Sequence, residues 1–174
     1  PIRWKDHNLY KTTFDLALYS MLIPEVRPDL IIELGSGDGG SAIWLSDMAK
    51  VHGLSTKIFS FDIKKPEISV PNVEFIQCDL NLIGKVPDMP NVGNFSGKKI
   101  LIEDAHVNVG EVLNAFDKVL GQGDYLVVED SDSKQETIEQ FVSGVGGKYL
   151  VDQFYVDFFG TNITCSTNSI FKVC

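Results

Sequence analysis

The chain is poor in cysteine, in basic residues and in long apolar runs. Its three cysteines, Cys78, Cys165 and Cys174, are odd in number and widely spaced, so neither a disulfide framework nor a zinc knuckle is predicted. No apolar run approaches the roughly 20 residues of a membrane-spanning helix, and no signal peptide is recognisable. We therefore expect a cytoplasmic protein that has no membrane partner.

Acidic residues outnumber basic ones by 24 to 15, which gives a formal net charge of −9. Because phosphate binding needs clustered lysines and arginines, this balance argues against nucleic acid as a partner. The 44% hydrophobic and 22% charged residues are typical of a globular chain. With no internal repeat or linker, we expect one domain over residues 1–174 that begins with a helical lead-in over residues 1–28.

Glycine is concentrated in the segment IIELGSGDGGS, residues 31–41. Four glycines in six residues allow a tight strand-to-helix turn and let a ligand approach the backbone closely. Gly35, Gly37 and Gly40 satisfy the pattern G-x-G-x-x-G, which fits dehydrogenases and methyltransferases equally well. An ordinary turn is the remaining alternative, although plain turns seldom need so many glycines.

Two acids in this segment favour one kind of cofactor over the other. Glu33 ends the apolar run and Asp38 lies in the turn, and both would repel a pyrophosphate that needs positive potential. The same carboxylates suit a ligand that carries an ammonium and a sulfonium group. The segment therefore predicts a site for S-adenosylmethionine.

Hydrophobic periodicity predicts strands and helices that alternate along the chain. Nearly continuous apolar runs predict buried strands over residues 29–34, 57–61, 73–76, 99–102 and 125–128. Amphipathic spacing predicts helices from Thr12 or Thr13 to Pro24, and over residues 40–52, 107–120 and 133–142. We expect a loop over residues 84–97, and antiparallel strands over residues 151–158 and 169–173.

This order predicts an α/β fold with a single Rossmann-like, doubly wound sheet, mostly parallel, of seven strands with an antiparallel C-terminal strand. Ligands of such sheets bind at the carboxyl ends of the strands. Five acids lie at or just after those ends: Glu33, Asp62, Asp104, Glu129 and Asp130. Because neighbouring carboxylates repel one another unless a cation is present, the acids predict bound positive charge.

One half of the sheet edge is predicted to hold the cofactor. Glu33 would face its ammonium group, Asp62 would accept hydrogen bonds from the ribose hydroxyls, and Asp79 would reach the adenine amino group. Asp62 as a plain turn residue and Asp79 as a solvated acid are the alternatives. The residues expected to bind the cofactor are Glu33, Gly35, Ser36, Gly37, Gly40, Ser41, Asp62 and Asp79.

The other half is predicted to hold a metal ion. Asp104, Glu129 and Asp130 form a set of oxygen ligands suited to Mg²⁺. A metal bound to substrate oxygens would lower the pKa of the attacking hydroxyl. His106 would then take the proton, or help to ligate the metal, and Lys11 is a weaker candidate for the base.

Three motifs carry a resemblance to a known family: PDLIIELGSG with the following GGS, IEDAH at 102–106, and GDYLVVED at 123–130. Over residues 11–174 the chain resembles class I S-adenosylmethionine-dependent methyltransferases. Within that class it is most similar to the cephalosporin hydroxylase-like proteins and the macrolide-sugar and rhamnosyl O-methyltransferases. The resemblance implies that Asp104, Glu129 and Asp130 match metal-binding acids and that His106 lies near a general base.

We therefore expect a Mg²⁺-dependent O-methyltransferase that acts on a hydroxyl of a small molecule, such as a natural-product sugar or a diol. An oxidoreductase of a hydroxylase system and a noncatalytic cofactor-binding module remain as alternatives. The aromatic segment at 153–159 is open to three interpretations: ordinary core packing, a wall of the substrate site, or a contact between subunits of a homo-oligomer.

Overall fold

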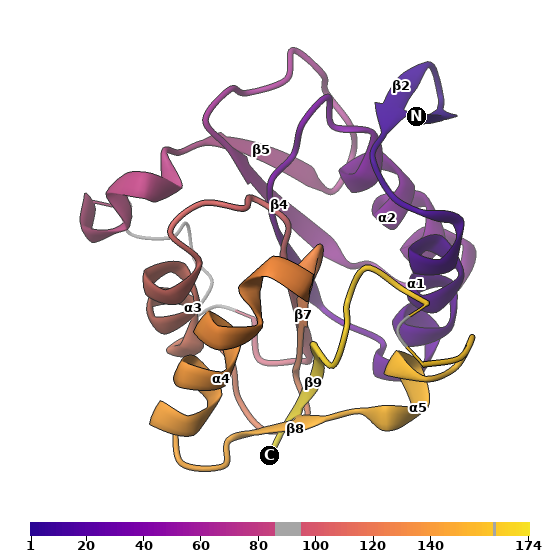
Figure 1. Ribbon diagram of the computed structural model, residues 1–174. Helices are drawn as coiled ribbons and strands as arrows, with labels where there is room; N and C mark the ends of the chain where they lie inside the picture. Colours follow the sequence, from indigo (N-terminus) through magenta and orange to yellow (C-terminus); the bar gives the residue numbers. More distant parts are fainter. Residues whose placement is uncertain (86–94, 162) are drawn as a thin grey trace.

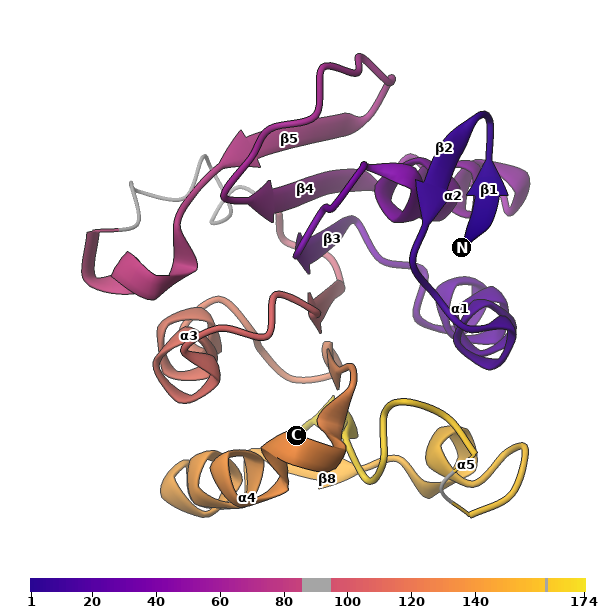
Figure 2. The same cartoon turned by 45° about the horizontal axis from the view of Figure 1, so that its top comes forward.

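The structure is a computed structural model that describes residues 1–85, 95–161 and 163–174. A seven-stranded sheet lies between two layers of helices (Figure 1). In Figure 2, α3 and α4 lie on one side of the sheet, and α1, α2 and α5 lie on the other. Two hydrophobic cores, one on each face, fill the space between the sheet and these layers.

The sheet has the strand order β5-β4-β3-β6-β7-β9-β8, in which β9 is antiparallel to both of its neighbours and the first five strands are parallel. This arrangement confirms the predicted fold class. Its strands are β3 (Leu30–Leu34), β4 (Lys57–Asp62), β5 (Val73–Gln77), β6 (Lys99–Glu103), β7 (Tyr125–Val128), β8 (Tyr149–Val151) and β9 (Ile170–Val173).

The helices confirm most of the predicted pattern. One layer contains α1 (Thr13–Val26), α2 (Gly40–Val51) and the short α5 (Gln153–Val156). The other contains α3 (Val109–Asp117), α4 (Gln135–Gly144) and the 3₁₀ helices η1 (Leu80–Lys85) and η3 (Ser131–Lys134). Thr12 begins α1 with a capping box, because its side chain accepts from the backbone of Asp15 while the Asp15 carboxylate accepts from Thr12. No helix in the described ranges is long and apolar enough to cross a membrane.

Three details differ from the sequence predictions. An unpredicted hairpin of β1 (Ile2–Trp4) and β2 (His7–Leu9) precedes α1. Helix α1 continues past Pro24 to Val26, since a proline close to the end of a helix disturbs few of its hydrogen bonds. The strand predicted over 151–158 is wrong beyond Val151, because the Asp152 carboxylate caps a helical turn there.

Most of the loop predicted over 84–97 lies outside the described residues, which resume at Phe95.

Side-chain alternation along the strands decides which face each strand-end acid reaches. Alternate residues of β3, β6 and β7 pack in opposite cores. Glu33 and Glu129 continue the positions that face α1 and α2, whereas Glu103 continues those that face α3 and α4. The acids at one sheet edge are therefore divided between two sides.

The N-terminal hairpin packs on α2 at Gly40. A Cβ atom at Gly40 would lie 2.1 Å from the backbone oxygen of Asn8, so only glycine lets the two segments approach this closely. The Trp4 indole N–H donates to Asp47 on α2 at 2.8 Å and fixes the other end of the hairpin. The third glycine of the G-x-G-x-x-G pattern is therefore required by packing.

We predict that Gly40→Ala lowers the free energy of unfolding by about 1–3 kcal/mol, the usual range for an overpacked site. Urea unfolding followed by circular dichroism measures this change. Gly144→Ala is the matched control, because Gly144 ends α4 and a Cβ there meets no atom within 4 Å. The control should stay within about 1 kcal/mol of the parent protein, and equal losses in both variants would contradict the packing role.

Candidate active site

The glycine loop lies directly against the carboxyl end of β6. Gly35 has a φ of +105°, and a Cβ atom on it would lie 2.6 Å from the backbone oxygen of Asp104. The backbone N–H of Gly37 donates to Asp62 Oδ2 at 3.0 Å, which joins the loop to the end of β4. The missing side chain at Gly35 and the hydrogen bond from Gly37 thus bring the ends of β3, β6 and β4 together.

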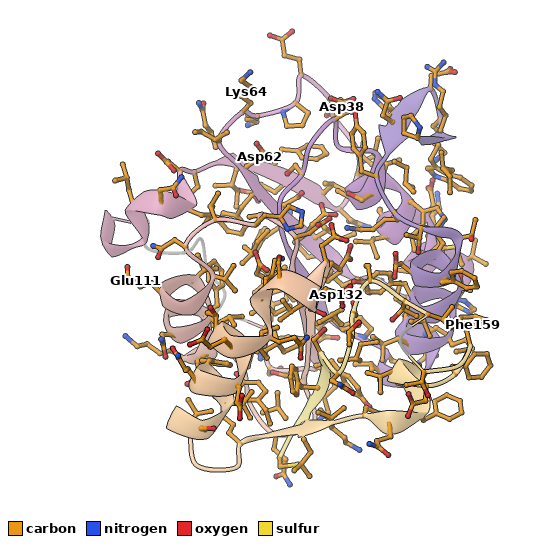
Figure 3. All side chains as sticks on the ribbon, viewed as in Figure 1. Asp38, Asp62, Lys64, Glu111, Asp132 and Phe159 are labelled. Carbon is orange, nitrogen blue, oxygen red and sulfur yellow. The ribbon has the colours of Figure 1, made fainter. Side chains whose placement is uncertain are left out.

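A cavity of about 320 Å³ opens at this junction, a size within the range of small-molecule sites. Figure 3 labels Asp62, which lies at its border. The residues expected to bind a cofactor that line it are Gly35, Ser36, Gly37, Ser41, Asp62 and Asp79. Glu33 and Gly40, also expected to do so, do not line it.

Glu33 is fully buried beside the cavity. The Ser60 hydroxyl donates to Glu33 Oε2 at 2.5 Å, and the Ser36 and Ser60 hydroxyls lie 2.6 Å apart, so a polar chain leads from Glu33 to the cavity wall. Burial raises the pKa of Glu33, and the charge of Lys11 acts against this rise. Glu33 Oε1 is buried without a hydrogen-bond partner among the described residues, so this acid has capacity for one more donor.

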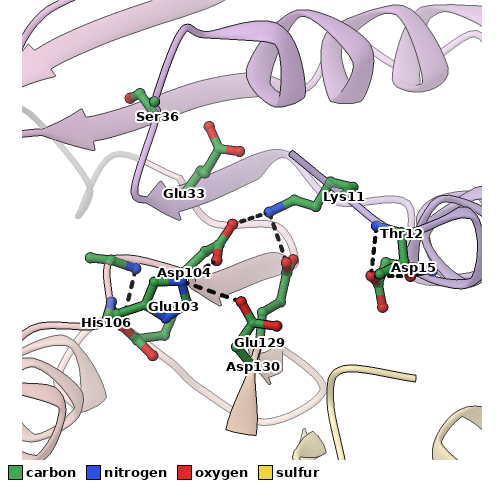
Figure 4. A network of polar contacts seen from close by, with 12 residues as sticks. Lys11, Thr12, Asp15, Glu33, Ser36, Glu103, Asp104, His106, Glu129 and Asp130 are labelled. Atoms are coloured by element: carbon green, nitrogen blue, oxygen red, sulfur yellow. Dashed lines mark hydrogen bonds and ion pairs between the residues drawn. The ribbon is translucent and has the colours of Figure 1, made fainter. Parts of the chain in front are cut away.

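Two of the predicted metal ligands meet His106 at the border of the cavity (Figure 4). His106 Nε2 lies 3.2 Å from Asp104 Oδ1 and 3.4 Å from Asp130 Oδ2. Each residue offers one ligand atom, and these atoms lie within 4.8 Å of one another. The two carboxylates are the donors that Mg²⁺ and Mn²⁺ prefer, and water would complete the coordination.

Glu129, the third predicted metal ligand, points the other way. Its Oε2 accepts from Lys11 Nζ at 2.8 Å and its Oε1 accepts from the Tyr19 hydroxyl at 2.6 Å. Lys11 also donates to Asp104. The structure therefore brings together Asp104, His106 and Asp130, while Glu129 lies on the α1 side of the sheet, as the alternation of consecutive residues requires.

Lys11 is a charged group in this arrangement. Burial opposes its charge, but Glu129, Asp104 and Glu33 outweigh burial and raise the pKa of Lys11. A lysine with a raised pKa is already protonated near neutral pH and cannot accept another proton. The structure therefore argues against Lys11 as the base.

A second buried lysine was not predicted. Lys134 donates to Glu103 Oε2 at 2.8 Å and to the backbone oxygen of Glu129 at 2.6 Å. Glu103 Oε1 accepts from the backbone N–H of His106 at 3.1 Å, and His106 has a φ of +58°. Glu103 and Lys134 thus hold the backbone that presents the imidazole. The sequence contained one indication of this pair. Glu103 lies at a position of its strand that alternation places on the side of α3 and α4.

Two further hollows adjoin the three-residue cluster. The larger, of about 710 Å³, is lined by His106, Asn108, Val109, Gly110, Glu111, Asp130, Ser133, Lys134 and Thr137. The smaller, of about 300 Å³, lies on the Lys11 side and also reaches Asp130. Glu111 lies far from Phe159 in Figure 3, and no residue of the 153–159 segment lines the cavity or either hollow.

The strand order and the glycine loop define the fold of class I methyltransferases. A solved structure of CmcI described as "Mg-SAM" has a TM-score of 0.81 at 21% identity, over 100% of this chain and 77% of that one. The model of the family described as "Rhamnosyl O-methyltransferase/CmcI" matches residues 1–149 of this chain. The chain belongs to this family, which confirms the resemblance found in the sequence.

Two curated relatives are rhamnosyl O-methyltransferases. The protein of Mycobacterium leprae is 30% identical over 137 residues, which are 74% of this chain and 60% of the relative. The protein of Mycobacterium tuberculosis H37Rv is 27% identical over 164 residues, which are 87% of this chain and 65% of the relative. The chain thus spans less than two thirds of the length of these relatives.

We predict that His106 titrates above pH 6.5 in the metal-free protein. The hydrogen bond with Asp104 raises its pKa, burial and Lys134 act against this, and the charges of Asp104 and Asp130 add to the rise. The resulting stabilisation is complete below pH 6.5 and is lost as the pH rises through the raised pKa. Imidazole NMR titration of Asp104→Asn should give a lower pKa for His106.

Asp62→Asn is the control for this titration, because Asp62 contacts the glycine loop and does not contact His106. It should leave the His106 titration unchanged. An unchanged titration in Asp104→Asn would contradict the pairing of these two residues.

Proposed function

We propose that the protein is an S-adenosylmethionine- and Mg²⁺-dependent O-methyltransferase that methylates a hydroxyl of a small molecule. One observation carries the proposal: His106 and Asp130 border both the cavity at the glycine loop and the larger hollow. A methyl donor in the cavity and a hydroxyl in the hollow would therefore meet at one set of charged groups. The proposal treats residues 1–174 as one catalytic domain.

The cavity offers carboxylates to two parts of S-adenosylmethionine, the ribose and the adenine. Asp62 offers a carboxylate to the ribose hydroxyls, and Asp79 offers one to the adenine amino group. Glu33 Oε1 leaves a buried acceptor without a partner among the described residues behind the glycine loop. The similarity to the CmcI structure described as "Mg-SAM" supports the same cofactor pair.

The metal would be held by Asp104 and Asp130, with His106 as a third donor or as the base. When bound, S-adenosylmethionine supplies an electrophilic methyl group and Mg²⁺ supplies a Lewis acid that lowers the pKa of a hydroxyl. His106 Nε2 faces both carboxylates, so it can take the hydroxyl proton once their charges are compensated. Glu103 fixes the His106 backbone and thereby positions the imidazole.

The larger hollow favours a polar acceptor. Asn108, Ser133 and Thr137 line it with amide and hydroxyl groups that can bind several hydroxyls of one ligand. A sugar or another diol fits this lining better than an apolar ring does. The rhamnosyl O-methyltransferases among the relatives support a sugar as the substrate class.

We predict that the protein binds S-adenosylhomocysteine and that Asp62→Ala raises the dissociation constant about 10–100-fold. Loss of hydrogen bonds to a charged group costs about 1.5–3 kcal/mol, which corresponds to this factor. Isothermal titration calorimetry measures both values. Asp157→Ala, an exposed acid outside the cavity, is the control and should bind as the parent does. No binding by the parent protein would contradict the cofactor half of the proposal.

We also predict that chelation of divalent ions abolishes methyl transfer and that Mg²⁺ restores it, since the charges at Asp104 and Asp130 need a cation. The measurement follows a radiolabelled methyl group from S-adenosylmethionine to a panel of hydroxyl acceptors that includes methyl rhamnoside. S-adenosylhomocysteine binding under the same chelation is the control and should persist. Transfer that survives chelation would reject the metal half.

A further inference from the structure

Lys11 is buried at a position where a sheet edge rich in carboxylates needs a cation. Its side chain is only 2% exposed, and its ammonium contacts both Asp104 and Glu129 (Figure 4). Tyr19 occupies the other oxygen of Glu129. Without Lys11, two nearly buried carboxylates would face each other with no positive charge between them, which is strongly unfavourable.

Asp104 connects this ion pair with the proposed metal cluster. Its Oδ2 accepts from Lys11, while its Oδ1 lies 3.2 Å from His106 Nε2. A cation that binds Asp104 on the His106 side therefore shares a ligand with the ammonium of Lys11. Two cations on one carboxylate repel each other, so each weakens the binding of the other.

The chain holds Lys11 in place from both sides. On one side β2 ends at Leu9, which is fully buried, and Asn8 donates to Asp38 of the glycine loop at 2.6 Å. On the other side Thr12 caps α1. Lys11 therefore enters the site as part of a backbone segment that is held on both sides, and its ammonium lies beside Asp104 and Glu129.

We infer that Lys11 is an internal counter-cation: its ammonium neutralises Asp104 and Glu129 when no metal is bound, and it competes with a divalent metal for Asp104. The inference rests on the metal site of the proposed function. It assigns to Lys11 a role in positioning the ligands and in setting the metal affinity, and it gives Lys11 no part in proton transfer.

The test is the affinity of metal-free protein for Mn²⁺, measured from the electron paramagnetic resonance signal of the free ion. Lys11→Met removes the charge and keeps much of the volume, so we expect Mn²⁺ to bind at least about tenfold more tightly. Lys11→Arg keeps the charge and should bind within about threefold of the parent. Lys5→Met removes an exposed charge that pairs with Asp47, and it should also leave the affinity unchanged.

Stability is the second measurement, because Lys11→Met leaves two buried carboxylates unpaired. If this variant is unfolded without metal, Mn²⁺ should restore its folding, seen as a cooperative thermal transition by circular dichroism. If it is folded, Mn²⁺ should raise its Tm more than that of the parent. Either result supports the exchange of one cation for another.

The results that would overturn the inference differ from those that would overturn the metal site. Mn²⁺ binding by the parent, with equal or weaker binding by Lys11→Met, would overturn the inference alone. A variant that stays unfolded at millimolar Mn²⁺ would do the same. No Mn²⁺ binding by the parent and none by Lys11→Met would reject the metal site and the inference with it.

Discussion

The compensation of carboxylates at one edge of the sheet is the constraint on which the rest of the site depends. Parallel strands place their carboxyl ends side by side, and here those ends carry acids that water does not fully solvate. Glu103 is paired with Lys134, and Glu129 is paired with Lys11. Each ion pair joins segments distant in the sequence, so the charge balance also holds the N-terminal segment and η3 against the sheet.

The two ion pairs also separate the acids that stabilise the fold from the acids that border the cavity. Lys11 neutralises Glu129 on one side of the sheet, and Lys134 neutralises Glu103 on the other. Asp104 and Asp130 border the cavity and both lie beside the imidazole of His106, and Asp104 also accepts from Lys11. A carboxylate pair with a partly exposed imidazole retains the capacity to bind an external cation, whereas Glu103 is already satisfied.

Much of this arrangement could be predicted from the sequence. Apolar runs and glycine punctuation gave the five parallel strands, and acids after those strands marked the correct edge of the sheet. The pairing of Lys11 with Glu129 could not be predicted, because 118 residues separate them and no local pattern encodes the contact. The packing of Gly40 against Asn8 could not be predicted either, because Gly40 also satisfies the nucleotide-loop pattern and was interpreted as part of it. The alternation of apolar residues over 151–158 was misleading, because the chain forms a helical turn after Val151, and Phe154 and Phe158 pack against each other there without a strand.

The most direct test of the charge balance is a crystal of the protein grown with S-adenosylhomocysteine and Mn²⁺, with diffraction data collected at the manganese absorption edge. We predict an anomalous peak among Asp104, His106 and Asp130, next to density for the cofactor product in the glycine-loop cavity. Anomalous density only at other surface acids, or none at saturating Mn²⁺, would contradict the assignment of these residues to an external cation.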